Sequence, residues 1–101
     1  MMILPEPVAF EWDSGNRDKN LLKHGITNKE IEESFDQDEK IIIEDEKHSL
    51  IEPRYMMWSE TNDGKLIMVF CTIRNGYVRV ISARSMNRKE RSFYEKKTEK
   101  I

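Results

Sequence analysis

The sequence predicts an α+β domain, in which helices flank an antiparallel β-sheet of about four strands. Segments of one type are grouped, with two helical patterns first, then several strand patterns, then a last helical pattern. The turn residues Asn62–Gly64 and Asn75–Gly76 join neighbouring strands as short hairpins. We expect the helices to cover one face of the sheet and to leave the other face free for binding. A chain of 101 residues fits a single domain, 1–101.

The first helix is expected to follow a short edge strand at 10–13. Asp13 can cap its N-terminus, because its side-chain oxygen can accept a free backbone N–H. The helix would then run to Gly25, which suits the left-handed position just past a helix end. Leu21 and Leu22 are its main apolar residues.

A second helix is expected to begin at Thr27. Thr27 and Glu30 have the spacing of a capping box, in which each side chain accepts a backbone N–H of the other residue. Ile26 and Ile31 occupy the two positions of a hydrophobic staple across this helix start. The pattern fades near Asp36.

Four runs rich in β-branched and apolar residues follow, and each predicts a strand. These runs are 40–46, 54–61, 65–74 and 77–84. The third run is apolar at both alternating sets of positions, which favours the centre of the sheet. The segment 48–53 between the first two runs is expected to be a loop. A last helix is expected from about Arg88 to Lys97, opened by the cap-like pair Asn87 and Glu90.

Charge is divided unevenly along the chain, although the net charge is only −2. Residues 28–52 hold 10 acidic and 3 basic residues, a balance of −7. Residues 72–101 hold 9 basic and 3 acidic residues, a balance of +6. A basic segment of this kind can bind phosphate groups even when the whole chain is acidic, because the local field attracts the anion.

The cellular compartment is inferred from the number of cysteines, from the length of the apolar runs and from the N-terminal segment. Cys71 is the single cysteine, so no internal disulfide can form, and a reducing compartment is expected. No apolar run approaches the ~20 residues of a membrane span. The N-terminal segment 1–10 lacks the basic start of a signal peptide. These observations favour a cytoplasmic protein that does not contact membranes.

Four pieces of the sequence carry a family resemblance. They are "FEWD" near the start, then "NLLKHGIT", then "PRYMMW", and finally "RVISARSMNRKERSFYEK". In this order the chain resembles the BrnT family of small bacterial toxins, over roughly residues 9–97. The "KHG" and "ISAR…ER..YE" pieces are the most specific parts of the match.

The resemblance implies a fold, an activity and a partner. The family is linked to RelE-like ribonuclease toxins, so a RelE-like antiparallel sheet flanked by helices is implied. The implied activity is cleavage of RNA as the toxin of a type II toxin–antitoxin pair. The implied partner is an antitoxin with a ribbon-helix-helix DNA-binding domain, so that DNA is contacted only through the antitoxin.

RNA can be cleaved without a metal ion, because its own 2′-hydroxyl can attack the phosphate. The protein must then move two protons and stabilise extra negative charge on the phosphate. His24, in the "KHG" piece, lies at a predicted helix C-terminus, where the helix dipole favours the protonated imidazole of a general acid. The alternative is that His24 only closes the helix. Lys23 beside it is expected to contact phosphate or solvent.

Three arginines are the candidates for binding the reacting phosphate, because a guanidinium group matches phosphate oxygens. Arg54 begins a predicted strand, Arg79 lies within one, and Arg84 ends it. Strict alternation places Arg79 and Arg84 on opposite faces of the sheet, whereas a β-bulge between them would bring them together. The alternative for Arg79 is a structural ion pair with a glutamate such as Glu60.

The last helix offers further RNA contacts. Arg88 and Arg91 are three residues apart and therefore share a helix face. Tyr94 could stack on a base, although Phe93 and Tyr94 together could equally anchor the helix to the sheet. Pairing of Arg91 with Glu95 would be a purely structural alternative.

Several other kinds of site are not supported by the sequence. His24 and His48 are far apart and lack nearby ligand spacing, so neither a zinc site nor any other metal or cofactor is expected. No glycine-rich phosphate loop is present.

Two alternatives to the ribonuclease remain. One is a catalytically weak module that binds RNA or only the antitoxin, and the other is an interaction protein with an exposed patch at 56–58.

Overall fold

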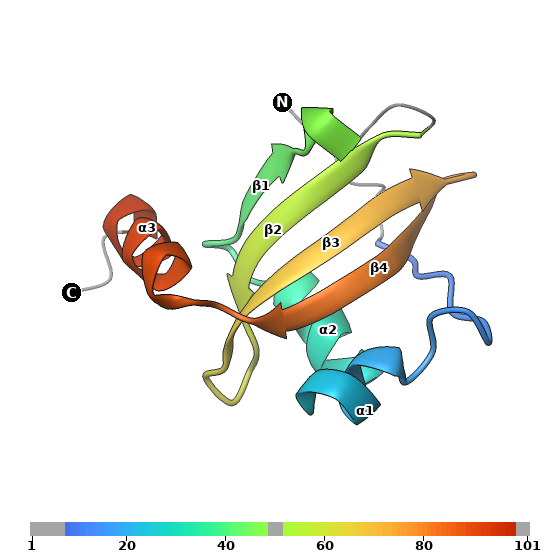
Figure 1. Ribbon diagram of the computed structural model, residues 1–101, viewed down its shortest axis with the longest axis horizontal. Coiled ribbons are helices and arrows are strands. Elements are labelled where there is room, and N and C mark those ends of the chain that lie inside the picture. Colours follow the sequence, from blue (N-terminus) through green and yellow to red (C-terminus); the bar gives the residue numbers. More distant parts are fainter. Residues whose placement is uncertain (1–7, 49–51, 99–101) are drawn as a thin grey trace.

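A computed structural model describes residues 8–48 and 52–98 of the chain. Its helices and strands alternate little along the sequence, and four strands form one sheet in the order β1-β2-β3-β4, with every neighbouring pair antiparallel (Figure 1). The elements are α1 (Lys19–His24), α2 (Asn28–Phe35), β1 (Ile41–Glu44), β2 (Arg54–Glu60), β3 (Leu66–Arg74), β4 (Tyr77–Ser85) and α3 (Arg88–Thr98), with a short 3-10 turn at Glu46–His48. The predicted α+β class with an antiparallel sheet is confirmed.

Helices lie on both faces of the sheet, so the expectation that they share one face was wrong. On one face, which we call the α2 face, Ile31 and Phe35 of α2 join a core that includes Met57, Val69 and Val80 of the strands. On the opposite face, Tyr94 of α3 packs with Met68 and Met86 in a second, smaller core. The chain runs on beyond the end of β4 before α3 begins (Figure 1), and the two cores place α3 on the side opposite α2.

The second and third helices begin as the sequence predicts. At α2, the Thr27 hydroxyl accepts the Glu30 backbone N–H, and the Glu30 carboxylate accepts the Thr27 N–H. Ile26 and Ile31 are both buried in the α2-face core, as a hydrophobic staple requires. At α3, the side chains of Asn87 and Glu90 accept one another's backbone N–H groups in the same way.

The first helix is shorter than predicted, and the segment 10–13 is not a strand. Phe10 forms only an isolated parallel bridge with Val78. The Asp13 carboxylate accepts the Gly15 N–H, which closes a turn rather than opening a helix. Asp18 then takes a left-handed conformation, with φ of 59°, so α1 cannot extend back beyond Lys19. Its C-terminal end at Gly25 is as predicted.

The outer edge of β4 is covered by the N-terminal part of the chain. Two buried asparagines bond to backbone groups of β4, with the Asn16 amide donating to the Val80 carbonyl and the Asn20 side-chain oxygen accepting the Ala83 N–H. Without such partners, an edge strand presents open N–H and C=O groups to other chains. Residues 9–20 therefore close the side of the sheet that β4 would otherwise leave exposed.

The tight turns between strands use the residues expected of them. Asn75 and Gly76 both have positive φ, 51° and 80°, as a two-residue hairpin turn requires.

Cys71 is buried in the α2-face core, and burial raises the pKa of its thiol to about 12. The thiol is therefore a packed apolar group rather than a nucleophile. Within residues 8–48 and 52–98, no helix is long and apolar enough to span a membrane.

Candidate functional site

The face of the sheet that carries α3 has arginines at the ends of two cross-strand rows. In one row, Arg54 of β2 is opposite Thr72 of β3, which is opposite Arg79 of β4. Two strand spacings separate the ends of this row, so the backbones of Arg54 and Arg79 are roughly 10 Å apart. Because residues opposite one another point to the same side, both arginines face the side of α3.

A β-bulge places Arg84 on that face as well. Cys71 is opposite Val80 and Phe70 is opposite Ser82, so Ile81 is an extra residue in β4. Without it, Arg79 and Arg84 would point to opposite sides of the sheet. With it, Arg84 is opposite Met68, which lies four residues from Thr72 on β3 and hence on the same face. The sequence did not decide whether a β-bulge lies between Arg79 and Arg84, and the structure contains one.

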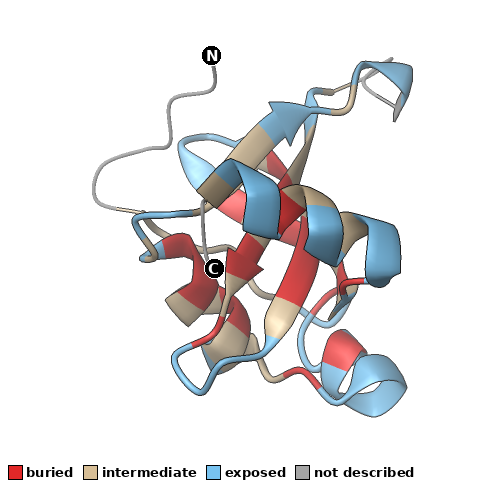
Figure 2. Ribbon diagram, turned by 90° about the vertical axis from the view of Figure 1, so that its left-hand side faces the viewer, coloured by how far each residue is buried: buried red, intermediate tan, exposed pale blue. Residues whose placement is uncertain are grey.

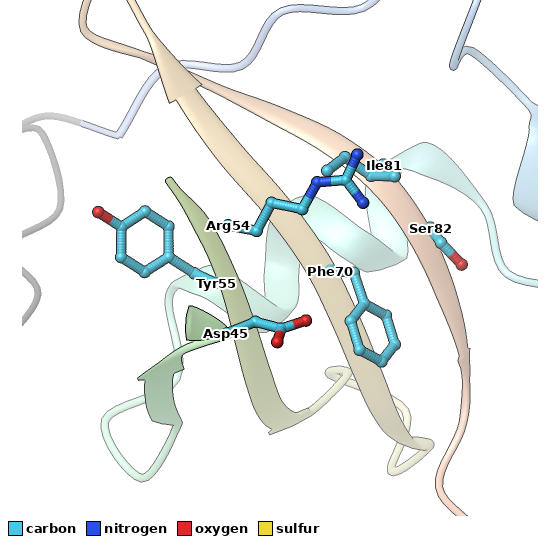
Figure 3. A pocket seen from close by; sticks show the side chains of 6 residues that line it. All are labelled: Asp45, Arg54, Tyr55, Phe70, Ile81 and Ser82. Carbon is cyan, nitrogen blue, oxygen red and sulfur yellow. The ribbon is translucent and has the colours of Figure 1, made fainter. Parts of the chain in front are cut away.

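Between these arginines lies a hollow of about 220 Å³, which we call the Phe70 hollow. Its lining residues are Asp45, Arg54, Tyr55, Phe70, Ile81 and Ser82. Figure 3 shows the ring of Phe70, the Asp45 carboxylate and the Arg54 guanidinium around it, whereas the Tyr55 side chain points away. The bulge lets two consecutive residues, Ile81 and Ser82, line the same hollow.

Arg84 forms one side of this region and is held in a defined orientation. Its two terminal nitrogens donate to the two carboxylate oxygens of Glu90, at 2.7 and 2.9 Å. The guanidinium carbon lies 5.5 Å from the centre of the Phe70 ring, within range of a cation–π contact. The hydrogen bond from Arg84 holds the pKa of the Glu90 carboxyl below its usual range. Arg84 thus links β4, α3 and the hollow.

Arg79 is held by carboxylates of the N-terminal segment. It donates to Glu11 at 3.0 Å and to both oxygens of Asp13, at 2.7 and 3.1 Å. These contacts, first of all those with Asp13, raise the pKa of the guanidinium further. The structural ion pair considered for Arg79 exists, and its partners are Glu11 and Asp13. Any phosphate bound by Arg79 would have to share it with them.

His24 and Lys23 lie away from the hollow. Both are exposed in the last turn of α1. The α1 helix is attached through Asn20 to the outer edge of β4, and neither residue is among those that line the hollow. The structure brings Arg54, Arg79 and Arg84 to one face of the sheet, and it does not add His24 to that group.

The candidates on the last helix have different environments. Arg88 and Arg91 are exposed on α3, whose outward turns are open to solvent while the strands behind them are buried (Figure 2). Tyr94 is only 1% exposed and belongs to the core under α3. Its ring therefore cannot stack on a base, and the anchoring alternative describes it instead. Phe93 supports this anchor, with its ring 5.0 Å from that of Trp58.

The patch considered at 56–58 is not an exposed surface. Met57 is fully buried in the α2-face core. Met56 and Trp58 are half-buried and pack against the core beneath α3. This weakens the alternative of an interaction protein built on these three residues.

Sequence reasoning missed several residues that shape the site. Asp45 and Phe70 were assigned only to predicted strands, and Glu90 only to a helix cap. A cross-strand register would have found them, because Phe70 is opposite Ser82 and Asp45 bonds through its N–H to the Arg54 carbonyl.

Within residues 8–48 and 52–98, no three His, Cys, Asp or Glu residues are grouped so as to hold a metal ion.

Comparison with known protein families gives a match over most of the chain. A family model described as a ribonuclease toxin, BrnT, of a type II toxin–antitoxin system matches residues 12–90. The matched range contains the whole sheet, α1, α2, and the arginines at positions 54, 79, 84 and 88. No curated protein matches the chain.

Proposed function

The chain belongs to the BrnT family of ribonuclease toxins of type II toxin–antitoxin systems, and on this premise we propose that it is a metal-independent endoribonuclease that cuts cellular RNA. Loss of RNA would stop translation and growth until an antitoxin binds the toxin. The proposal includes a bacterial, cytoplasmic setting, kinship with RelE-like toxins and a single domain over 1–101.

The observation that carries the proposal is the convergence of three arginines on one sheet face, around the Phe70 hollow. Arg54 of β2 and Arg79 of β4 share this face through their pairing with Thr72, and Arg84 joins them because of the bulge at Ile81. Guanidinium groups match the oxygens of a phosphodiester and stabilise the charge that develops on it. A half-buried aromatic ring between them suits an unstacked base of single-stranded RNA.

The reaction that fits this surface is an internal transfer. The 2′-oxygen of the RNA attacks the adjacent phosphorus while its proton passes to a base. The bond from phosphorus to the 5′-oxygen breaks, and that oxygen takes a proton from an acid. The products are a 2′,3′-cyclic phosphate and a 5′-hydroxyl. In this scheme Arg84 and Arg79 bind the oxygens of the reacting phosphate, while Arg54, across the hollow, binds the adjacent nucleotide.

Two residues are the candidates for the proton steps. His24 is the general acid in our proposal, which requires the bound RNA to bring the leaving 5′-oxygen within hydrogen-bond reach of the end of α1. Glu90 is the candidate for the general base, because Arg84 lowers the pKa of its carboxyl and the carboxylate lies 2.7 Å from Arg84, beside the phosphate-binding surface. A general acid or base of this type contributes about 10²–10⁴-fold to the rate. Lys23, Arg88 and Arg91 would bind RNA further along.

The proposed partner is an antitoxin with a ribbon-helix-helix domain, through which the pair would contact DNA. The type II family implies an antitoxin. We propose that it covers the arginine face with a segment that carries carboxylates. Glu11, Asp13 and Glu90 already show that carboxylates are favourable partners for Arg79 and Arg84.

Incubation of the purified chain with a defined RNA in excess EDTA tests the proposal. We expect cleavage products that end in a cyclic phosphate, and we expect Arg84→Ala and Arg79→Ala to lose them. Lys29→Ala is a matched control, because Lys29 is an exposed cation on α2, on the opposite face of the sheet. A chain that binds its antitoxin but leaves RNA intact would refute the ribonuclease.

That outcome would favour a second candidate, a binding module without catalytic activity. The observation behind it is that carboxylates already neutralise both Arg79 and Arg84, in a chain of net charge −2. Such a module would bind RNA or antitoxin through the same face. RNA binding that survives without any cleavage, in the protein free of antitoxin, would identify it.

A further inference from the structure

The Phe70 hollow has the size and lining of a site for one nucleobase. Its volume of about 220 Å³ is smaller than the roughly 300–1,000 Å³ of pockets for larger ligands. Phe70 and Ile81 give it apolar walls, the Asp45 carboxylate points towards it from the β1 side, and the Arg54 guanidinium reaches towards Ile81 (Figure 3). A flat base could lie against the ring and still reach polar groups with its edge.

Backbone contacts hold the two charged residues in register. The Asp45 N–H donates to the Arg54 carbonyl at 2.7 Å, so the sheet pairing of β1 and β2 continues one residue beyond β1. Phe70 is fixed between Met56 of β2 and Ser82 of β4. Side chains mounted on a sheet in this way can select a ligand by geometry, because little of the site must be ordered on binding.

The two charged groups offer opposite hydrogen-bonding patterns. The ionised carboxylate of Asp45 is an acceptor with two oxygens, and the guanidinium of Arg54 is a donor with five N–H groups. Each of these groups can form several hydrogen bonds at once, so a bond to a ligand can coexist with the bonds that the side chain makes within the protein. A matching base must therefore present adjacent donors on one edge and acceptors on another.

Guanine meets this requirement better than the other bases. Its N1–H and N2–H₂ are adjacent donors that suit a carboxylate, and its O6 and N7 are acceptors that suit arginine. Adenine has an acceptor at N1, which would face the carboxylate unfavourably. Uracil has a single ring N–H flanked by two acceptors, and cytosine has an acceptor beside its amino group. Only guanine pairs two donors with the carboxylate.

We propose that the Phe70 hollow is a guanine subsite, so that the chain cuts RNA next to a guanosine. Asp45 accepts the guanine N1–H and N2–H₂, Arg54 donates to its acceptor edge, and Phe70 stacks on the ring. This inference rests on the proposed ribonuclease, because it assigns the substrate preference of the same face. Arg84 lies against the other side of Phe70, where the adjacent phosphate would be bound.

Nucleotide binding tests the subsite without requiring cleavage. The full chain is titrated with guanosine, inosine and adenosine 3′-monophosphates, and the dissociation constants are measured by calorimetry or by NMR shifts of Phe70. We expect guanosine to bind about tenfold or more tightly than adenosine, as one bidentate base contact allows. Inosine lacks the N2 amino group and should fall between them. Equal binding of guanosine and adenosine would overturn the proposal.

Matched variants locate the preference in the hollow. Asp45→Asn replaces one acceptor by a donor, so it should abolish the advantage of guanosine over adenosine. Glu46→Gln is the control, because Glu46 is the next residue, is exposed, and does not line the hollow. If Asp45→Asn keeps the full preference, Asp45 does not read the base and the inference is wrong.

Mapping of cleavage sites separates this inference from the proposed function. Cuts next to guanosine in wild type, but not in Asp45→Asn, would support both. Cuts without regard to base would refute the guanine subsite while the ribonuclease stands. Selective guanosine binding without any RNA cleavage would support the subsite and refute the ribonuclease.

Discussion

At the scale of single residues, Arg84 connects structure with the proposed chemistry. It is bonded to Glu90 through both of its terminal nitrogens and lies over Phe70. Its side chain is 35% exposed and that of Glu90 is 17% exposed, so the pair is part-buried. A phosphate bound by Arg84 would share the guanidinium group with Glu90, because five N–H donors can serve both. The pair positions the guanidinium group without removing it from use.

Replacement of Arg84 or Arg79 by alanine should reduce RNA cleavage at least tenfold, while the fold is retained. Loss of one donor to a developing oxyanion typically costs ~2.7–4 kcal/mol of transition-state stabilisation. Cleavage rates and circular dichroism of each variant check this. Arg84→Lys keeps the charge but loses the two-pronged geometry, so it should recover only part of the activity.

Glu90→Gln distinguishes binding of phosphate from structural pairing. It weakens the ion pair but keeps the Arg84 guanidinium. If Arg84 acts only by holding α3, then Glu90→Gln and Arg84→Ala should cause the same loss of stability and of RNA binding. If Arg84→Ala and Arg79→Ala both keep full cleavage activity, the two arginines are structural and the proposed site is wrong.

His24→Gln should impair cleavage more than His48→Gln does. His24 lies in the "KHG" piece at the end of α1, whereas His48 ends the 3-10 turn at Glu46–His48. The pH dependence of the cleavage rate gives the mechanism, since loss of a general acid removes the limb that falls at high pH. An unchanged profile in His24→Gln would exclude His24 as the general acid and leave Lys23, Glu60 or the RNA itself for this proton step.

Acid should narrow the difference in stability between wild type and Glu90→Gln. The hydrogen bond from Arg84 holds the pKa of Glu90 below its usual 4.5 in the folded chain. A carboxylate of this kind stabilises the fold at pH values above its unfolded pKa, and the stabilisation is lost as the pH falls through the folded pKa. Urea unfolding at a series of acidic pH values checks this. A difference that is unaffected by acidification would contradict it.

At the scale of elements, local rules predicted what local contacts determine. The caps at Thr27 and Asn87 and the hairpin at Asn75–Gly76 depend on residues within a few positions of one another, and all are as predicted. The false helix start at Asp13 and the crossing of α3 to the opposite face depend on distant contacts. Asn16 and Asn20 bond to β4, more than 60 residues away, and no local pattern contains that information.

Removal of the Asn20 side chain should destabilise the protein by about 1–3 kcal/mol, because the N–H of Ala83 would be buried without its acceptor. Asn20 is only 3% exposed, and its oxygen is 3.0 Å from that N–H. Urea unfolding of Asn20→Ala measures the change.

Asn28→Ala is the matched control for this experiment. Asn28 bonds to Asp18 at the surface, and surface substitutions usually change stability by less than about 0.5 kcal/mol. Equal effects of the two substitutions would show that the edge of β4 does not depend on Asn20. A larger loss in Asn20→Ala would show that residues 9–20 are part of the folded sheet rather than a loose extension.

At the scale of the whole molecule, the two charged segments of the sequence form different elements, although α3 of the basic segment packs beside Ile41 of the acidic one. The acidic segment 28–52 contains α2 and β1, whereas the basic segment 72–101 contains β4 and α3. The sequence alone predicted the four strands and their order. It could not decide on which face each arginine lies, because one bulged residue, Ile81, reverses the answer for Arg84.

The antitoxin should associate with the arginine face, and its association should slow as salt is added. A segment carrying carboxylates would be attracted by Arg54, Arg79, Arg84 and Arg88, and complementary charge acts mainly on the association rate. Exposed charges are screened over about 8–10 Å at 0.1–0.15 M salt, so stopped-flow association rates should fall across that range. Arg88→Ala should show a weaker salt dependence than Lys29→Ala, its counterpart on the α2 side.

Hydrogen exchange on the complex would locate the antitoxin directly. We expect protection of β4 and of the N-terminal turn of α3, where the arginines of that face are mounted. An antitoxin that instead joins toxin molecules through the acidic half would protect 28–52 and leave β4 and α3 unchanged. That pattern, together with association rates independent of salt, would overturn masking of the phosphate-binding face, since neither the position nor the physics of the contact would then involve the arginines.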